Sequence, residues 1–286
     1  MRIVDVDDPA DPRLDDVRDL NHPTRRPDLP GGRGLVIAEG NYVVGRMLLS
    51  RFTPHLLVGT EARRRKLERD AVAEGWDLAA RLAAAGDPPY YRVSSETLSA
   101  VIGFGSSRDI LAAAEKAPEP ELGQVLDTAR TLVVLEGVND PENIGAIFRG
   151  VAAFGADGVL LGAATGDPLY RRVVRVSMGH VLRVPFRRLE GSPTTWQRGL
   201  DELHERGFRT VALTPGTTTT VAEALAGDPG RVALVVGAEG PGLTEHAMRA
   251  CTTRAAIPMA PGTDSLNVAT AATLGLYERF RTPPGC

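Results

Sequence analysis

Residues 257–267 have the sequence Ile257-Pro-Met-Ala-Pro-Gly-Thr-Asp-Ser-Leu-Asn267 and lead into an alanine-rich stretch that runs to Glu278. An apolar strand end therefore meets a loop rich in proline and glycine, and this loop opens into an expected helix. A serine or aspartate at such a junction can cap a helix by accepting hydrogen bonds from its free N–H groups. One polar residue is enough for a cap, whereas Asp264, Ser265 and Asn267 crowd together here. The excess predicts a binding loop.

Two earlier segments share this character. Residues 143–149, Asn-Ile-Gly-Ala-Ile-Phe-Arg, lie on the first turns of an expected helix, and residues 236–243, Val-Gly-Ala-Glu-Gly-Pro-Gly-Leu, follow an expected strand. Three glycines and a proline around Glu239 allow the backbone to approach a ligand closely. Each segment alone has a plainer interpretation. The first fits an asparagine near a helix start with a solvated arginine, and the second fits an ordinary turn.

The C-terminal half of the chain alternates between apolar strands and helices. Continuous apolar strands in such an alternation predict a parallel sheet covered on both faces, and ligands of such sheets bind at the carboxyl ends of the strands. All three loops follow a strand, so we expect them to form one site. Strands are expected at 131–136, 158–161, 181–185, 209–213, 231–236 and 254–258, and helices at 143–154, 169–178, 194–206, 243–249 and 266–280.

A shorter β/α alternation precedes this half, with strands expected at 35–38, 56–58 and 90–93 and a final apolar run at 110–114. The two alternations are separated by Ala-Pro-Glu-Pro-Glu-Leu-Gly at 117–123, a composition typical of linkers. We therefore predict an N-terminal domain over 1–116, a linker over 117–126 and a second domain over 127–286.

Composition narrows the functional classes. The formal net charge of −3 excludes an overall basic, charge-driven nucleic-acid binder. Two cysteines, Cys251 and Cys286, cannot build a disulfide framework, which fits a reducing cytoplasm. No apolar run reaches membrane-spanning length, no Gly-x-Gly-x-x-Gly follows a strand, and no metal-ligand spacing occurs. We expect a cytoplasmic protein without a metal.

One segment, 171–188, is locally basic and has no acidic residue. It contains Arg171, Arg172, Arg175, Arg183, Arg187 and Arg188. The segment fits either a solvated helix face or a contact with RNA phosphates. We take Arg171, Arg172, Arg175 and Arg183 as the candidate RNA-binding residues.

Taken together, the three loops resemble the three motifs of the SpoU (TrmH-like) RNA ribose 2′-O-methyltransferases of the SPOUT superfamily. The first motif is matched by Asn143-x-Gly145-x-x-x-Arg149 and the second by Gly237-x-Glu239-Gly240-x-Gly242. The third is matched by Ile257-Pro-Met259 with Ser265-Leu266-Asn267. The resemblance spans about 131–280 and implies a trefoil-knot α/β domain with a mostly parallel sheet. The N-terminal part resembles, more weakly, the ribosomal-protein-like RNA-binding domain of many relatives.

The resemblance also implies a cofactor, a partner and roles for residues. It implies S-adenosyl-L-methionine in the knot, a homodimer through the C-terminal domain, and an active site completed across the dimer interface. The implied catalytic residues are Arg149, Asn143, Glu239, Ser265 and Asn267. The implied cofactor-binding residues are Leu213, Thr214, Gly237, Gly240, Ile257, Met259, Ser265 and Leu266. Because a guanidinium keeps its proton at ordinary pH, we favour Arg149 as a clamp on a neighbouring phosphate over Arg149 as a base.

The leading hypothesis is an S-adenosylmethionine-dependent methyltransferase that acts on a ribose 2′-hydroxyl of structured RNA. The added N-terminal domain favours rRNA over tRNA as the substrate. The alternative is a non-catalytic RNA-binding scaffold with the same dimeric fold, which would have no need of Arg149, Glu239 and Asn267. A nucleotide-dependent oxidoreductase of Rossmann type is disfavoured because its glycine fingerprint is missing.

Overall fold

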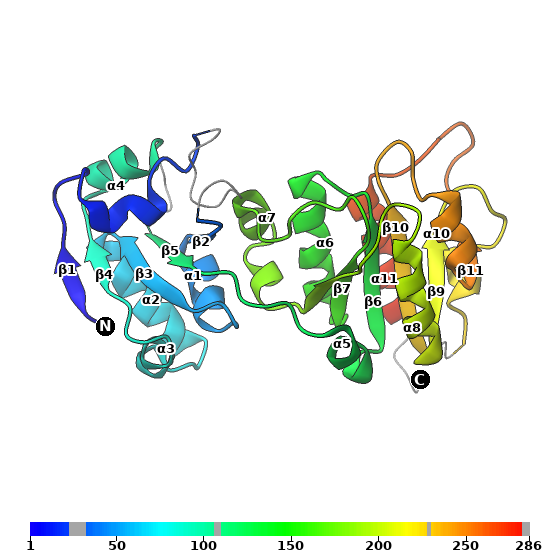
Figure 1. Ribbon diagram of the computed structural model, residues 1–286, viewed down its shortest axis with the longest axis horizontal. Coiled ribbons are helices and arrows are strands. Elements are labelled where there is room, and N and C mark those ends of the chain that lie inside the picture. The colour runs from blue at the N-terminus through cyan, green and yellow to red at the C-terminus, as the bar shows by residue number, and fades with distance from the viewer. Residues whose placement is uncertain (23–32, 106–109, 228–229, 282–286) are drawn as a thin grey trace. The chain divides into compact units, whose positions relative to one another are not determined.

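The computed structural model of the protein describes residues 1–22, 33–105, 110–227 and 230–281 (Figure 1). The chain divides into two compact units. Unit 1 comprises Met1–Pro118 and Leu169–Arg183, and unit 2 comprises Glu119–Pro168 and Val184–Cys286. The division after Pro118 falls inside the predicted linker, and helix α5 (Leu122–Thr128) begins inside it as well.

Unit 1 is built around a mixed sheet. Its strands are β1 (Ile3–Asp5), β2 (Val36–Glu39), β3 (Pro54–Gly59), β4 (Tyr90–Arg92) and β5 (Ile110–Ala114), in the order β1-β4-β3-β5-β2. β4 pairs with β1 and β3 in parallel, whereas β5 pairs with β2 and β3 antiparallel. The surrounding helices are η1 (Pro12–Val17), α1 (Asn41–Leu48), α2 (Glu61–Ala73), α3 (Leu78–Ala84) and α4 (Ser95–Ile102). The three strands expected in this region are present, the apolar run 110–114 forms β5, and β1 is an addition.

A segment from the second half of the chain completes unit 1. It contains α7 (Arg171–Val176) and the short helix η2 (His180–Leu182). Arg171 is buried, and its Nη1 donates to Glu39 Oε1 at 2.6 Å while its Nη2 donates to Asn21 Oδ1 at 2.7 Å. The guanidinium also lies 5.3 Å from the centre of the Phe104 ring. Residues 169–183 are therefore an integral part of the unit 1 core.

The prediction of a strand at 181–185 is wrong. Gly179 adopts a left-handed conformation with φ 79°, and residues His180–Leu182 form a 3-10 turn. Val181 and Leu182 are apolar because this turn is buried, and a short apolar run does not distinguish a buried turn from a buried strand. The strand in this region, β8, begins after Pro185 and spans Phe186–Arg188.

Unit 2 contains a six-stranded sheet in which every recorded pairing between strands is parallel, as predicted. Its strands are β6 (Thr131–Glu136), β7 (Gly158–Leu161), β8, β9 (Phe208–Leu213), β10 (Arg231–Gly237) and β11 (Thr253–Ala255). The order is β11-β9-β10-β6-β7-β8, so β10 and β6 lie at the centre. The central strand β6 is apolar on both faces, since Leu132–Leu135 are all fully buried.

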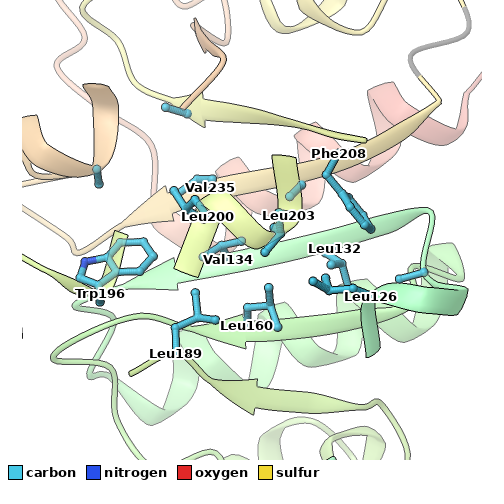
Figure 2. Packing of buried hydrophobic residues seen from close by; sticks show 14 of the residues in the cluster. Leu126, Leu132, Val134, Leu160, Leu189, Trp196, Leu200, Leu203, Phe208 and Val235 are labelled. Atoms are coloured by element: carbon cyan, nitrogen blue, oxygen red, sulfur yellow. The ribbon is translucent and has the colours of Figure 1, made fainter. Parts of the chain in front are cut away.

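Helices cover both faces of this sheet. On one face α5, η3 (Trp196–Arg198), α8 (Gly199–Glu205) and α10 (Glu245–Ala250) enclose a core that includes Leu126, Leu200, Leu203 and Ala247 (Figure 2). On the other face lie α6 (Pro141–Phe154) and α11 (Val268–Phe280), while the short helix α9 (Val221–Ala224) packs beside β11.

Two glycines let α11 approach its neighbours closely. A Cβ on Gly150 of α6 would lie 3.3 Å from Thr273 Oγ1 of α11, and a Cβ on Gly275 would lie 3.1 Å from Leu213 and Leu234 side chains. The chain thus returns from the edge strand β11 to the middle of the sheet (Figure 1). Such a return is what the knotted fold implied by the resemblance requires.

Among the residues that the structure describes, no helix has the length and apolar character needed to cross a membrane. The same residues contain no cluster of histidine, cysteine and carboxylate side chains suited to holding a metal ion.

Candidate active site

A cavity of about 580 Å³ lies in unit 2 at the carboxyl ends of β9, β10 and β11. Three segments form it: the end of β9 with Thr214 and Pro215, the loop 236–243, and the stretch from Ile257 to the first turns of α11. All the residues predicted to bind a cofactor line this one cavity, namely Leu213, Thr214, Gly237, Gly240, Ile257, Met259, Ser265 and Leu266. Two of the three loops singled out in the sequence therefore meet at one place.

The loop after β10 is shaped by its glycines. It folds back on itself through an N–H···O bond of 3.0 Å from Gly242 to Ala238. A Cβ on Gly237 would lie 2.3 Å from backbone atoms of Gly242 and Leu243, which no side chain can tolerate. Gly240 and Gly242 have φ of 86° and 70°, in the region that favours glycine. The bare backbone of this loop thus forms one wall of the cavity.

Asn267 connects the three motifs. Its Nδ2 donates to Asn143 Oδ1 at 2.8 Å and to Glu239 Oε1 at 2.6 Å. Its Oδ1 accepts from the backbone N–H groups of Ala269 and Thr270 at 3.0 and 3.1 Å, which caps α11. Both amide hydrogens are therefore used, and Asn267 fixes Glu239 and Asn143 relative to the helix start.

The helix cap is a point where the sequence was ambiguous. A serine or aspartate was expected to cap the last helix, whereas the structure assigns this role to Asn267. Ser265 and Asp264 are exposed and line the cavity instead. The polar excess noted in the sequence is thus directed at the cavity.

Arg149 stands apart from the other predicted catalytic residues. Its side chain is exposed on α6, and Arg149 is not among the residues that line the cavity. Within the described parts of the chain, no ion pair or hydrogen bond of its guanidinium is recorded. By contrast, Asn143 on the same helix is buried and bound to Asn267. The chain therefore brings Asn143, Glu239, Ser265 and Asn267 together at or beside the cavity and leaves Arg149 outside it.

The candidate RNA-binding arginines divide into two groups. Arg171 is committed to Glu39 and Asn21, so its guanidinium has no surface left to offer a phosphate. Arg172 and Arg183 are exposed and Arg175 is half-buried, all in unit 1. We therefore leave Arg171 out of any proposed contact with RNA.

Some residues at the site were missed in the sequence. Met248 on α10 lines the cavity and had no local signal that could have singled it out. Glu136 did have one, because it is a carboxylate at the end of an otherwise apolar strand, and it is 5% exposed. Cys251 packs against the core nearby, and burial raises the pKa of its thiol to about 12, so it is no nucleophile at neutral pH.

Comparison with known proteins gives a consistent result. The model of the SpoU rRNA Methylase family matches residues 130–277. The chain is 54% identical over 284 residues to a protein of Mycobacterium bovis named an uncharacterized tRNA/rRNA methyltransferase, covering 99% of this chain and 93% of that protein. A protein of Mycobacterium tuberculosis with the same descriptive name matches equally well.

Solved structures extend the likeness to the whole chain. The crystal structure of an rRNA methyltransferase from Sinorhizobium meliloti has a TM-score of 0.74 and 25% identity, and the match covers 98% of each chain. The AdoMet-bound form of that protein gives the same values.

Proposed function

Because the chain belongs to the SpoU rRNA methylase family and is an S-adenosylmethionine-dependent RNA methyltransferase, we propose that it methylates a ribose 2′-hydroxyl of structured RNA. The observation that carries the proposal is the linkage of Asn143, Glu239 and Asn267 beside the cavity. These residues come from all three motifs of the 2′-O-methyltransferases that the sequence resembles. A non-catalytic scaffold would have no use for this polar linkage.

We further propose that the cavity of unit 2 holds the S-adenosylmethionine. Its volume falls within the range of about 300–1,000 Å³ typical of small-molecule sites. Leu213, Ile257, Met259 and Leu266 offer apolar surface for an adenine ring, while the side-chain-free backbone of the glycine loop offers N–H and C=O groups. Asp264 and Ser265 add polar groups at the rim. The polar groups of Asp264 and Ser265 and the accessible backbone of the glycine loop fit S-adenosylmethionine, which is a nucleoside with a charged amino-acid side chain.

The residues of this chain have separate tasks in the proposed reaction. The cofactor supplies an activated methyl group, so the protein has to orient the acceptor hydroxyl and favour its oxyanion. Asn267 holds Glu239 at the cavity edge, where its second oxygen can accept a hydrogen bond from a ribose hydroxyl. Arg149 clamps a neighbouring phosphate through its planar fork of donors, which favours negative charge on the attacking oxygen.

The isolation of Arg149 supports a homodimer. A Cβ on Gly150 would lie 3.3 Å from Thr273 Oγ1, so Arg149 and Leu274 belong to the same stretch of the α6–α11 pair. On α11, Leu274 is 37% exposed and Tyr277, three residues later, is 54% exposed, which leaves an apolar strip uncovered. We propose that a second copy covers this strip and that its Arg149 completes the site.

Replacing Tyr277 with glutamate is expected to weaken the dimer, because a carboxylate would have to be desolvated in the interface. Light scattering after size-exclusion chromatography should then give a monomer mass at concentrations where the wild type is dimeric. Val72 on α2 is 82% exposed and provides the matched control, since Val72→Glu also adds a charge to an apolar surface position. A wild type that is monomeric at micromolar concentration would contradict the proposal.

Replacing Leu266 with tryptophan is expected to raise the Kd for S-adenosylmethionine at least about tenfold, because the indole would fill the cavity that Leu266 lines. Titration calorimetry measures this directly. Leu266→Ala is the control, because it makes the side chain smaller instead of larger. This variant should bind S-adenosylmethionine more tightly than Leu266→Trp does. Equal affinity of wild type and Leu266→Trp would place the cofactor elsewhere.

We propose that the substrate is rRNA rather than tRNA, and that the reaction takes place in the cytoplasm. The separate unit 1, with Arg172, Arg175 and Arg183 on its segment 169–183, supports recognition of a large folded RNA. Mapping 2′-O-methyl positions in the rRNA and tRNA of cells with and without the gene decides between the two. A methylation lost from tRNA alone would overturn the rRNA assignment.

A further inference from the structure

The glycine loop of the cavity is tied to the core by a buried carboxylate. Glu136 is the last residue of β6 and is 5% exposed. Its Oε2 accepts a bond from the backbone N–H of Thr244 at 2.8 Å, and its Oε1 accepts one from the Thr244 hydroxyl at 2.9 Å. Thr244 is the residue at which the loop ends, because it is the N-cap of α10.

The same carboxylate also lies beside the start of the loop. Glu136 and Gly237 are partners in the parallel register of β6 and β10. The loop 237–244 therefore leaves the sheet next to Glu136 and returns to a residue that Glu136 binds twice. One side chain thus closes the loop at its base.

Glu136 is in turn held by the core beneath it. The indole Nε1 of Trp196 donates to Glu136 Oε1 at 2.8 Å, and Trp196 is fully buried (Figure 2). The indole is itself fixed, since a Cβ on Gly162 at the end of β7 would lie 2.9 Å from Trp196 Cε3. Along the described residues no salt bridge to Glu136 is recorded, so neutral donors alone satisfy this buried carboxylate.

We propose that Glu136 is a positioning residue for S-adenosylmethionine binding: it preorganises the loop 237–243, although it does not line the cavity itself. A loop fixed before binding costs less conformational entropy when the ligand arrives, which raises affinity. A glutamine cannot replace the glutamate. Both oxygens face donors, so either orientation of an amide sets its NH₂ group against an N–H or O–H. The inference rests on the proposed location of the cofactor in this cavity.

Glu136→Gln is expected to raise the Kd for S-adenosylmethionine about tenfold in titration calorimetry. Hydrogen exchange of the free protein should show faster exchange at residues 238–240, 242 and 243 than in wild type. Leu203→Ala is the matched control, because it damages the same core under Trp196 without touching the loop. At a temperature where both variants are folded, the control should keep the wild-type affinity.

Unchanged affinity of folded Glu136→Gln, or a loss no larger than that of Leu203→Ala, would overturn the inference. If Glu136→Gln fails to fold, the exposed partner Thr244 carries the test. Thr244→Ser keeps the hydroxyl and should bind as wild type, whereas Thr244→Ala loses it and should bind several-fold more weakly. Equal affinities of these two variants would also overturn the inference. If instead Leu266→Trp binds as well as wild type, the cavity assignment itself has failed.

Discussion

Arg149→Ala is expected to lower kcat for RNA methylation by about 10²–10³-fold, the range seen when one preorganised donor to developing negative charge is removed. The Kd for S-adenosylmethionine and the melting temperature should stay near the wild-type values. Arg149 is exposed and does not line the cavity, so neither the fold nor the cofactor depends on it. Single-turnover transfer of a labelled methyl group to RNA from cells that lack the gene measures the chemical step.

Arg149→Lys separates the two proposed roles of the guanidinium. A lysine keeps the positive charge but loses the planar fork, so a phosphate clamp should retain part of the activity with an unchanged pH–rate profile. A base would be replaced by a group of lower intrinsic pKa, and the profile would move. An alanine variant with wild-type kcat would exclude Arg149 from the reaction altogether.

Asn267→Asp is expected to lower kcat/KM by about 10²-fold and also to lower the melting temperature, because the bonds that it loses lie within the folded chain. Aspartate is as good an N-cap as asparagine, so the bonds to Ala269 and Thr270 should survive. The carboxylate has no hydrogen to donate, however, so the bonds to Asn143 and Glu239 are lost and a like charge faces Glu239. Loss of the hydrogen bond to the charged Glu239 costs about 1.5–3 kcal/mol, loss of the neutral bond to Asn143 costs about 0.5–1.5 kcal/mol, and every 1.4 kcal/mol is about tenfold.

Two further variants isolate the charge effect. Asn267→Ser keeps a capping oxygen and loses both donated bonds without adding charge, so its activity should fall between those of wild type and Asn267→Asp. Asn267→Ala loses the cap too and should be about 1 kcal/mol less stable than Asn267→Ser. Wild-type activity of folded Asn267→Asp would show that the linkage of the three motifs is not needed.

The parts of the fold that could be predicted from the sequence are those with local signals. The central strands β6, β7 and β10 of unit 2 are apolar runs, and the binding loops combine glycine with polar residues that no helix cap requires. Contacts between residues that are far apart in the sequence have no local signal and could not be predicted. Arg171 seemed to belong to an RNA surface because its partner Glu39 lies 132 positions earlier. Glu136 stood out locally as a carboxylate at a strand end, but its contacts could not be predicted because its donors come from residues 196 and 244.

The position of Arg149 shows another limit of sequence reasoning. Spacing along α6 places Asn143 and Arg149 on neighbouring helix faces, and the structure buries the first and exposes the second. Periodicity indicates which residues face the core, but it carries no information about what covers an exposed face. The proposal that a partner subunit covers this face rests on the exposed apolar side chains of Leu274 and Tyr277 in the structure.

The excursion 169–183 has a consequence for the order in which the protein can be made. A ribosome completes residues 1–118 first, yet at that stage Glu39 lies on β2 without the arginine that pairs with it. The nascent residues 1–118 therefore lack the Arg171–Glu39 pair and the rest of segment 169–183, which are part of the final core. Unit 1 reaches its final packing only after α7 has been synthesised.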